Sequence, residues 1–132
     1  MSARPRKAHD PPELHELEQE VMDEVWRLGE TPGRAVLDGL NARSDRVRAY
    51  TTIMTILHRL HGKGLLSRRR EGKGDVYVAT LSREEYADAR AAAQVGALVD
   101  EWGELALVHF AKQMASLDPA RSEQLARLAR RE

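Results

Sequence analysis

The sequence contains no cysteine and only 5% aromatic residues, so several classes of chemistry are absent from it. Without thiols there is no disulfide, no thiolate metal site and no cysteine nucleophile. The sequence also lacks a run of about 18 apolar residues and a signal-peptide segment. We therefore expect a cytoplasmic protein without a membrane span. Its 132 residues correspond to one domain, or to a small domain with an appendage.

Net charge is also missing, because 21 basic side chains balance 21 acidic ones. Their distribution is uneven. Residues 1–33 hold four basic and eight acidic side chains, residues 34–73 hold ten and three, and residues 74–132 hold seven and ten. The middle segment is the place where a polyanion would be attracted. Together with the helix described next, this imbalance favours a nucleic acid as partner.

Residues 49–60 predict an amphipathic helix, around which we interpret the rest of the chain. At about 100° per residue, the apolar side chains fall opposite most of the polar ones. β-branched threonine is unfavourable in a helix, so three threonines indicate a role other than helix stability. Hydroxyl and guanidinium groups are the kind that contact base edges and phosphates. The apolar side carries Tyr50, Ile53, Ile56, Leu57 and Leu60, and the other side with its flanks carries Arg48, Thr51, Thr52, Thr55, His58 and Arg59.

Two shorter helices are expected before this one. We expect residues 1–9 to form a disordered basic arm. Asp10 and Pro11 then resemble the N-cap and first position of a helix that ends at Gly29. Thr31-Pro32 repeats the signal for a second helix, and a polar turn leads into residues 49–60. Three helices in this order predict a helix-turn-helix arrangement.

A basic hairpin is expected directly after the third helix, which Gly62 and Gly64 close. Residues 65–70 and 75–80 read as strands, joined by the glycine-bearing loop 71–74. Such a hairpin is a wing, and it can lay Arg68, Arg70 and Lys73 along a phosphate backbone. The predicted fold class is mainly α, an α+β winged helix-turn-helix domain over residues 10–81. An unrelated surface hairpin is the alternative.

Residues 82–132 predict a helical dimerisation region. Ser82 and Glu85 form a capping box, Gly103 interrupts the helix that follows, and Asp118-Pro119 caps a last helix. Three thin helices cannot bury their apolar stripes alone, and a second copy of the chain is the simplest partner. The residues expected at the dimer contact are Tyr86, Val95, Leu98, Val99, Trp102, Leu107, Phe110, Met114, Leu125 and Leu128.

From about Leu14 to Leu128 the chain resembles the BlaI/MecI family of penicillinase repressors, which are dimeric winged-helix transcription regulators. The most specific mark is Ala49-Tyr50-Thr51-Thr52-Ile53-Met54-Thr55. Weaker marks keep the family's order and spacing. They are Leu17-Glu18, Val21-Met22, Trp26, Arg59-Leu60, Lys63-Gly64, Tyr77 and Ala106-Leu107-Val108-His109-Phe110.

The resemblance implies that the third helix enters a palindromic operator, with Thr51, Thr52, Met54 and Thr55 at base-reading positions. It also implies relief of repression when a membrane sensor metalloprotease cleaves the dimerisation region, where His109-Phe110 stands at the place of the family's Asn-Phe bond. With the wing, the residues expected to contact DNA are Arg48, Tyr50, Thr51, Thr52, Met54, Thr55, His58, Arg59, Arg68, Arg70 and Lys73.

Other functions have less support in the sequence. His58 and His61 have a spacing that could join two metal ligands, but without cysteine or a converging carboxylate we expect neither a metal nor another cofactor. No catalytic signature surrounds any serine, so we expect no enzyme activity. Two alternatives stay open. One is a winged-helix module for protein interaction, and the other is a one-component regulator that binds a small molecule near Tyr86 and Trp102.

Overall fold

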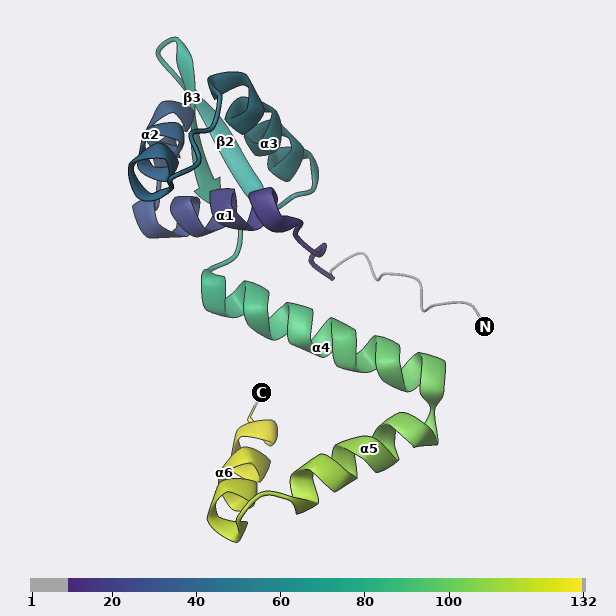
Figure 1. The fold of residues 1–132 in the computed structure, drawn as a ribbon. Helices are drawn as coiled ribbons and strands as arrows, with labels where there is room; N and C mark the ends of the chain where they lie inside the picture. The colour runs from purple at the N-terminus through teal and green to yellow at the C-terminus, as the bar shows by residue number, and fades with distance from the viewer. Residues whose placement is uncertain (1–9, 132) are drawn as a thin grey trace. The chain divides into compact units, whose positions relative to one another are not determined.

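The computed structural model describes residues 10–131, so the expected basic arm at residues 1–9 lies outside the described residues. Within that range the chain forms two compact units, residues 10–91 and residues 92–131. The elements of the first unit are α1 (Glu16–Leu28), β1 (Thr31–Pro32), α2 (Gly33–Arg43), α3 (Tyr50–Gly62), β2 (Leu66–Glu71), β3 (Gly74–Ala79) and the start of α4 (Arg83–Trp102). Figure 1 shows three helices gathered around a hairpin. This is the winged-helix arrangement that the sequence predicted.

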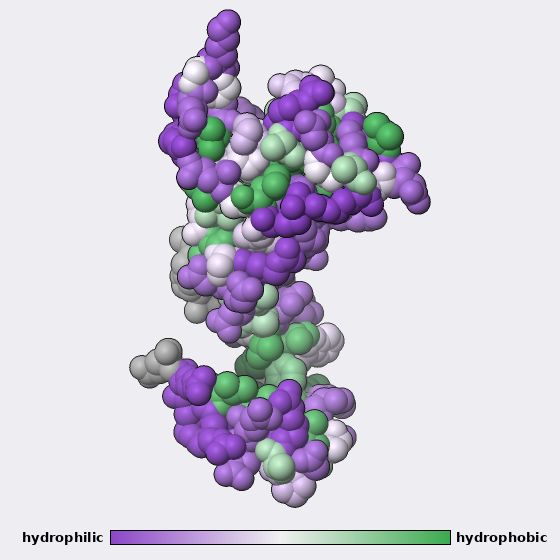
Figure 2. All heavy atoms as spheres, turned by 90° about the vertical axis from the view of Figure 1, so that its left-hand side faces the viewer, coloured by the Kyte–Doolittle hydropathy of each residue, from purple (hydrophilic) through white to green (hydrophobic). Residues whose placement is uncertain are grey.

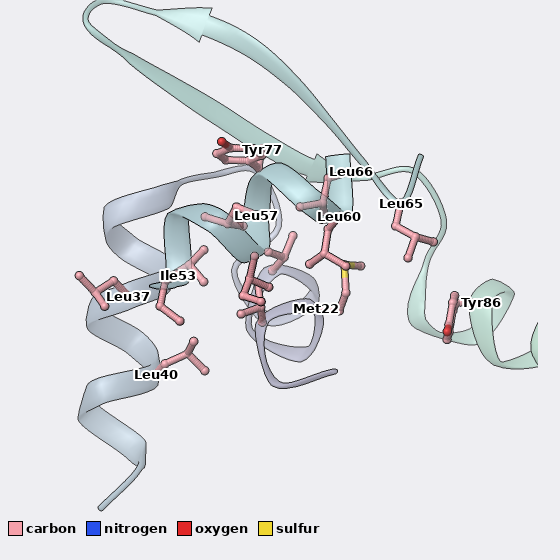
Figure 3. Close-up of a cluster of buried hydrophobic side chains, with 14 residues drawn as sticks. Met22, Leu37, Leu40, Ile53, Leu57, Leu60, Leu65, Leu66, Tyr77 and Tyr86 are labelled. Atoms are coloured by element: carbon pink, nitrogen blue, oxygen red, sulfur yellow. The ribbon is translucent and has the colours of Figure 1, made fainter. Parts of the chain in front are cut away.

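The core of the first unit lies under α3. Ile53, Leu57 and Leu60 have no exposed surface, and they repeat at the three- and four-residue spacing of one helix face. Figure 3 shows them directed into a cluster with Met22 of α1 and Leu40 of α2. Burying each of these side chains contributes roughly 1.5–3 kcal/mol. The core therefore fixes which face of α3 remains outside.

The start of α1 differs from the expectation. The helix begins at Glu16, and the backbone N–H of its N-cap His15 donates to the Glu18 carboxylate at 3.1 Å. The predicted cap at Asp10 is wrong, because Pro11 is followed by Pro12, and a residue before proline disfavours the helical conformation. The carbonyls of Pro11 and Pro12 instead accept hydrogen bonds from side chains of α4.

The expected helix cap at Thr31-Pro32 is also wrong, because these residues form the strand β1. Thr31 pairs with Tyr77 and Pro32 with Val76, which completes an antiparallel sheet of order β1-β3-β2. Helix α2 therefore begins at Gly33. A Cβ at Gly33 would lie within about 3 Å of the Met54 side chain, so the missing side chain lets α2 approach α3 closely.

The hairpin that forms the wing has a shorter turn than the sequence suggested. The register pairs Glu71 with Gly74, so Gly72 and Lys73 alone connect β2 to β3. Gly72 has φ +62°, a conformation that suits glycine at the first turn position of a two-residue hairpin. The hairpin consequently holds Lys73 at its tip.

The expected helix boundaries after the wing are confirmed. Ser82 and Glu85 form the capping box, with the Ser82 N–H on the Glu85 carboxylate at 2.8 Å and the Glu85 N–H on the Ser82 hydroxyl at 3.0 Å. Gly103, at φ +57°, separates α4 from α5 (Glu104–Ala115). Asp118 caps α6 (Pro119–Ala129) by accepting from the Arg121 N–H at 2.9 Å. None of the described helices is both long and apolar enough to cross a membrane.

Buried carboxylates of α1 bind basic side chains, one from α1 itself and two from the middle segment. Glu18 accepts from the Lys63 ammonium at 2.8 Å, and Glu24 pairs with Arg27 at 2.5 Å and with Arg43. Burial is the largest single influence on the pKa of Glu18 and raises it, but the hydrogen bonds from Lys63 and the His15 N–H, together with the positive charge of Lys63, outweigh burial, so the pKa is lowered. The Arg27 guanidinium, with Arg43 nearby, holds the pKa of Glu24 below its ordinary value of 4.5. The pair of Glu24 with Arg43 joins α1 to α2, and the pair of Glu18 with Lys63 joins α1 to the end of α3.

Replacing Glu24 by glutamine is expected to remove a pH-dependent part of the stability. Because the folded pKa of Glu24 is lowered, its contribution is present above about pH 4.5 and is lost as the pH falls through the folded pKa. Glu24→Gln should cost roughly 1–2 kcal/mol at pH 7 and less at pH 3. Thermal unfolding followed by circular dichroism from pH 7 to pH 3 measures this. The control is Glu84→Gln on the exposed start of α4, and a constant difference between Glu24→Gln and the parent across that range would contradict the assignment.

Candidate nucleic-acid interface

The polar face of α3 lies on the surface of the first unit. Thr51, Thr52, Thr55, His58 and Arg59 are exposed, on the side away from the core. Their exposure follows from the helical period, because the buried residues occupy the positions between them. This face therefore presents hydroxyl, imidazole and guanidinium groups on one rigid element.

Met54 lies at the border between this face and the core. It is half-buried and packs against the core cluster. With Thr55, His58 and Arg59 it also lines a shallow depression of about 420 Å³. Its thioether therefore gives the exposed face an apolar edge.

Apolar side chains are also exposed at the start of α3. Tyr50 was expected on the core side, but 52% of it is exposed. It occupies the first turn, where no other element covers it. Val47, in the turn before the helix, is 77% exposed and was missed by the sequence reasoning. The sequence did contain a signal for its exposure, because Val47 is a lone apolar residue in a polar, basic turn.

Basic side chains of the wing extend the α3 face. Arg68 approaches His58, with 3.1 Å between a guanidinium nitrogen and Nδ1. Arg70 lies two residues after Arg68 and therefore on the same side of β2. Arg69, between them, points to the other side and pairs with Glu30 and Glu71. Figure 2 shows the projecting hairpin as a hydrophilic surface. Within residues 10–131 no group of three or more metal-ligating side chains comes together.

Arg48 does not belong to this surface, which corrects the expectation from the sequence. Its side chain is only 17% exposed and pairs with Glu20 of α1 at 3.0 Å. The side-chain amide of Asn41 binds the backbone of Arg48. It accepts a hydrogen bond from the Arg48 N–H at 2.7 Å and donates one to the Arg48 carbonyl at 3.2 Å. Arg48 and Asn41 therefore position the start of α3 from inside the unit.

Fewer basic side chains are unpaired than the ten counted in residues 34–73 suggest. Arg43, Arg48 and Lys63 are bound by carboxylates of α1. Four basic side chains of the α3 face and the wing have no carboxylate partner among residues 10–131. They are Arg59, Arg68, Arg70 and Lys73. Folding thus concentrates the free cationic groups beside the exposed threonines.

The residues expected at a dimer contact divide between the two units. Tyr86 is buried in the core of the first unit, so its assignment to the dimer contact is corrected. The other expected residues lie on α4, α5 and α6, where most are exposed or half-buried. Leu105 and Val108 are also exposed there, and they were missed because they lie outside the stripe of Leu107, Phe110 and Met114 on α5. His109 is exposed and Phe110 half-buried, both inside α5.

The family model of the penicillinase repressors matches residues 14–131. The chain belongs to the penicillinase repressor family. Relatives named "Transcriptional regulator BlaI" from two strains of Mycobacterium tuberculosis are 33% identical over 105 residues, which is 78% of this chain and 75% of theirs. The solution structure of the DNA binding domain of the repressor BlaI aligns with a TM-score of 0.51 and 30% identity, covering 58% of this chain and 90% of that one. The resemblance seen in the sequence is confirmed, and the chain is a winged-helix member of a DNA-binding repressor family.

Arg48 and Arg68 are expected to respond differently to replacement by alanine. Arg68→Ala removes an exposed cation, so the slope of log K against log salt should become shallower by about one. Arg48→Ala breaks a contact inside the unit, so it should lower the melting temperature by a few degrees and leave that slope unchanged. Fluorescence anisotropy with a labelled duplex at several salt concentrations, together with thermal unfolding, measures both effects. Equal slopes for Arg68→Ala and the parent would contradict the placement of the wing.

Proposed function

We propose that the protein is an operator-binding repressor that acts as a homodimer, with α3 of each copy in the major groove. The single observation that carries this proposal is the composition of one surface. Exposed threonines of α3 lie beside cations that pair with no carboxylate of residues 10–131, and α3 itself is fixed by the core beneath it. Family membership supports the same interpretation.

The α3 face suits base reading, and the wing suits phosphate binding. Threonine hydroxyls donate to and accept from base edges, and the threonine methyl contacts thymine. Thr51 and Thr55, four residues apart, lie on the same side of the helix and can reach neighbouring bases. Arg68, which lies beside His58 of α3, and Lys73 at the tip of the hairpin carry positive charge that suits the phosphate backbone. Val47 and Tyr50 add apolar area for sugar or thymine methyl groups.

The second unit supplies the argument for a homodimer. Among residues 92–131 only Ala106 of the apolar side chains is buried, while Trp102 is 51% exposed. Green apolar surface is visible on these helices in Figure 2. A second copy covers such stripes symmetrically, and two linked winged helices bind two half-sites with a higher effective concentration.

A small-molecule effector is the alternative occupant of the second unit. Leu98, Trp102, Leu105, Phe110 and their neighbours line an apolar groove of about 350 Å³. That volume is at the lower end for ligand sites. Leu107, Val108, Met114 and Leu128 of the same unit are also exposed, and with the groove they make up more apolar surface than a small ligand covers. The extent of the stripe favours a protein partner.

Relief by proteolysis at His109-Phe110 stays a prediction from the family resemblance. Both residues lie within α5, where the backbone is helical. A protease binds its substrate as an extended strand, so cleavage requires that α5 first unwinds. A membrane sensor metalloprotease as partner stays a prediction in the same way. Incubation of the purified protein with such an activated sensor, followed by mass spectrometry of the products, decides both.

Thr55→Ala is expected to relax base preference at one operator position. Loss of the hydroxyl and methyl contacts should cost roughly 1–3 kcal/mol on the best site and little on sites that already differ there. Selection of bound duplexes from a random pool by the parent and the variant measures the change. Thr80→Ala, on an exposed threonine outside α3, is the control. Unchanged preference at every position would contradict the placement of α3.

Leu98→Glu is expected to separate the proposed dimer. A carboxylate buried in an apolar contact is strongly unfavourable, so the variant should sediment as a monomer. Its affinity for a full operator should then fall to that for a single half-site. Gln94→Glu adds the same charge to the same helix at a polar position, and it should behave like the parent. Sedimentation of the parent as a monomer at every concentration would overturn the dimer.

A further inference from the structure

The first two turns of α4 are built into the DNA-binding unit. Tyr86 belongs to the buried core, and its ring centroid lies 5.6 Å from that of Trp26 on α1. Its hydroxyl donates to the Pro12 carbonyl at 2.6 Å. Figure 3 shows Tyr86 at the edge of the core cluster, on the helix that leaves it. The chain therefore does not become independent of the first unit at residue 82, where the sequence placed the boundary.

Arg83 and Trp26 hold the same turns from a second direction. The Arg83 guanidinium lies over the Trp26 ring, 5.2 Å from its centroid, and donates to Asp23 at 2.8 Å. The Trp26 indole N–H donates to the Leu81 carbonyl at 2.9 Å. We call Trp26, Arg83 and Tyr86 the α4 anchor. Each contact is worth little alone, but together they restrain both the rotation and the tilt of α4.

Two features set this joint apart from an ordinary flexible connection. Only Thr80, Leu81 and Ser82 separate β3 from α4, and Leu81 packs against the core cluster. The helix then continues without a break from Arg83 to Trp102. The helix whose first turns are held in this way is therefore the same helix that carries Val95, Leu98 and Trp102.

We propose that the α4 anchor sets the separation and orientation of the two DNA half-sites that the protein accepts. This inference rests on the proposed homodimer, because one winged helix has no half-site spacing. Trp26, Arg83 and Tyr86 are positioning residues, since none of them belongs to the exposed face of α3 or to the wing. An anchored α4 restrains the two DNA-binding units, whereas a released α4 lets each unit turn independently.

The experiment measures the binding of the full-length protein to a series of duplexes. Each duplex carries two inverted copies of the selected half-site, with the separation increased by one to five base pairs. About five added base pairs place the half-sites on opposite faces of the duplex, so the parent should lose about tenfold or more in affinity. Arg83→Ala and Trp26→Phe are the test variants, singly and combined, and Glu84→Ala on the same exposed turn is the control.

The combined variant is expected to bind a single half-site as the parent does and to lose less than about threefold across the spacing series. Unchanged half-site affinity and a cooperative thermal transition show that the DNA-binding unit is folded. Arg83→Ala changes an exposed side chain and keeps the test available if Trp26→Phe unfolds the protein. A steep spacing profile in every folded anchor variant would overturn the anchor and leave the dimer standing. A flat profile in the parent would overturn the anchor, and a parent that binds two half-sites no more tightly than one would overturn the dimer as well.

Discussion

The packing of α3 on α1 and α2 is the constraint on which the interface depends. Ile53, Leu57 and Leu60 are completely buried, and the helical period then leaves Thr51 and Thr55 outside. Rotating α3 about its axis would bury hydroxyl groups without partners and expose leucine, so both effects oppose it. The core of this small unit therefore determines the chemistry of its reading surface.

Charge is arranged by the same packing. Glu18, Glu20 and Glu24 on α1 each bind a basic side chain from a later element. These pairs stabilise the contacts of α1 with α2, α3 and the turn between them, and they remove three cations from the outer field. Arg59, Arg68, Arg70 and Lys73 stay on the α3 face and the wing, where their combined potential attracts a polyanion. The carboxylates of α1 therefore help to determine which basic side chains stay unpaired, although α1 is not part of the basic surface.

Patterns with a fixed period were predictable from the sequence, and contacts between distant residues were not. The core face of α3, the Ser82 capping box and the break at Gly103 follow from local spacing. Thr31-Pro32 forms a strand because Tyr77 pairs with it, and a strand of two residues has no period to detect. The roles of Arg48 and Tyr86 depend on Glu20 and Trp26, 28 and 60 residues away in the chain. A helical wheel also cannot show that nothing covers Tyr50.

The two units differ in what holds them together, and this difference has a regulatory consequence. Residues 10–91 enclose a core of their own, whereas residues 92–131 bury little more than Ala106. In the proposed dimer, association would supply the stability of the second unit, and that stability would depend on protein concentration. In that dimer, an event that disturbs the second unit would lower operator occupancy through lost bivalency and would leave the proposed base-reading residues of α3 intact. Control of this kind needs no change in α3, so the reading surface and the regulated surface can diverge independently.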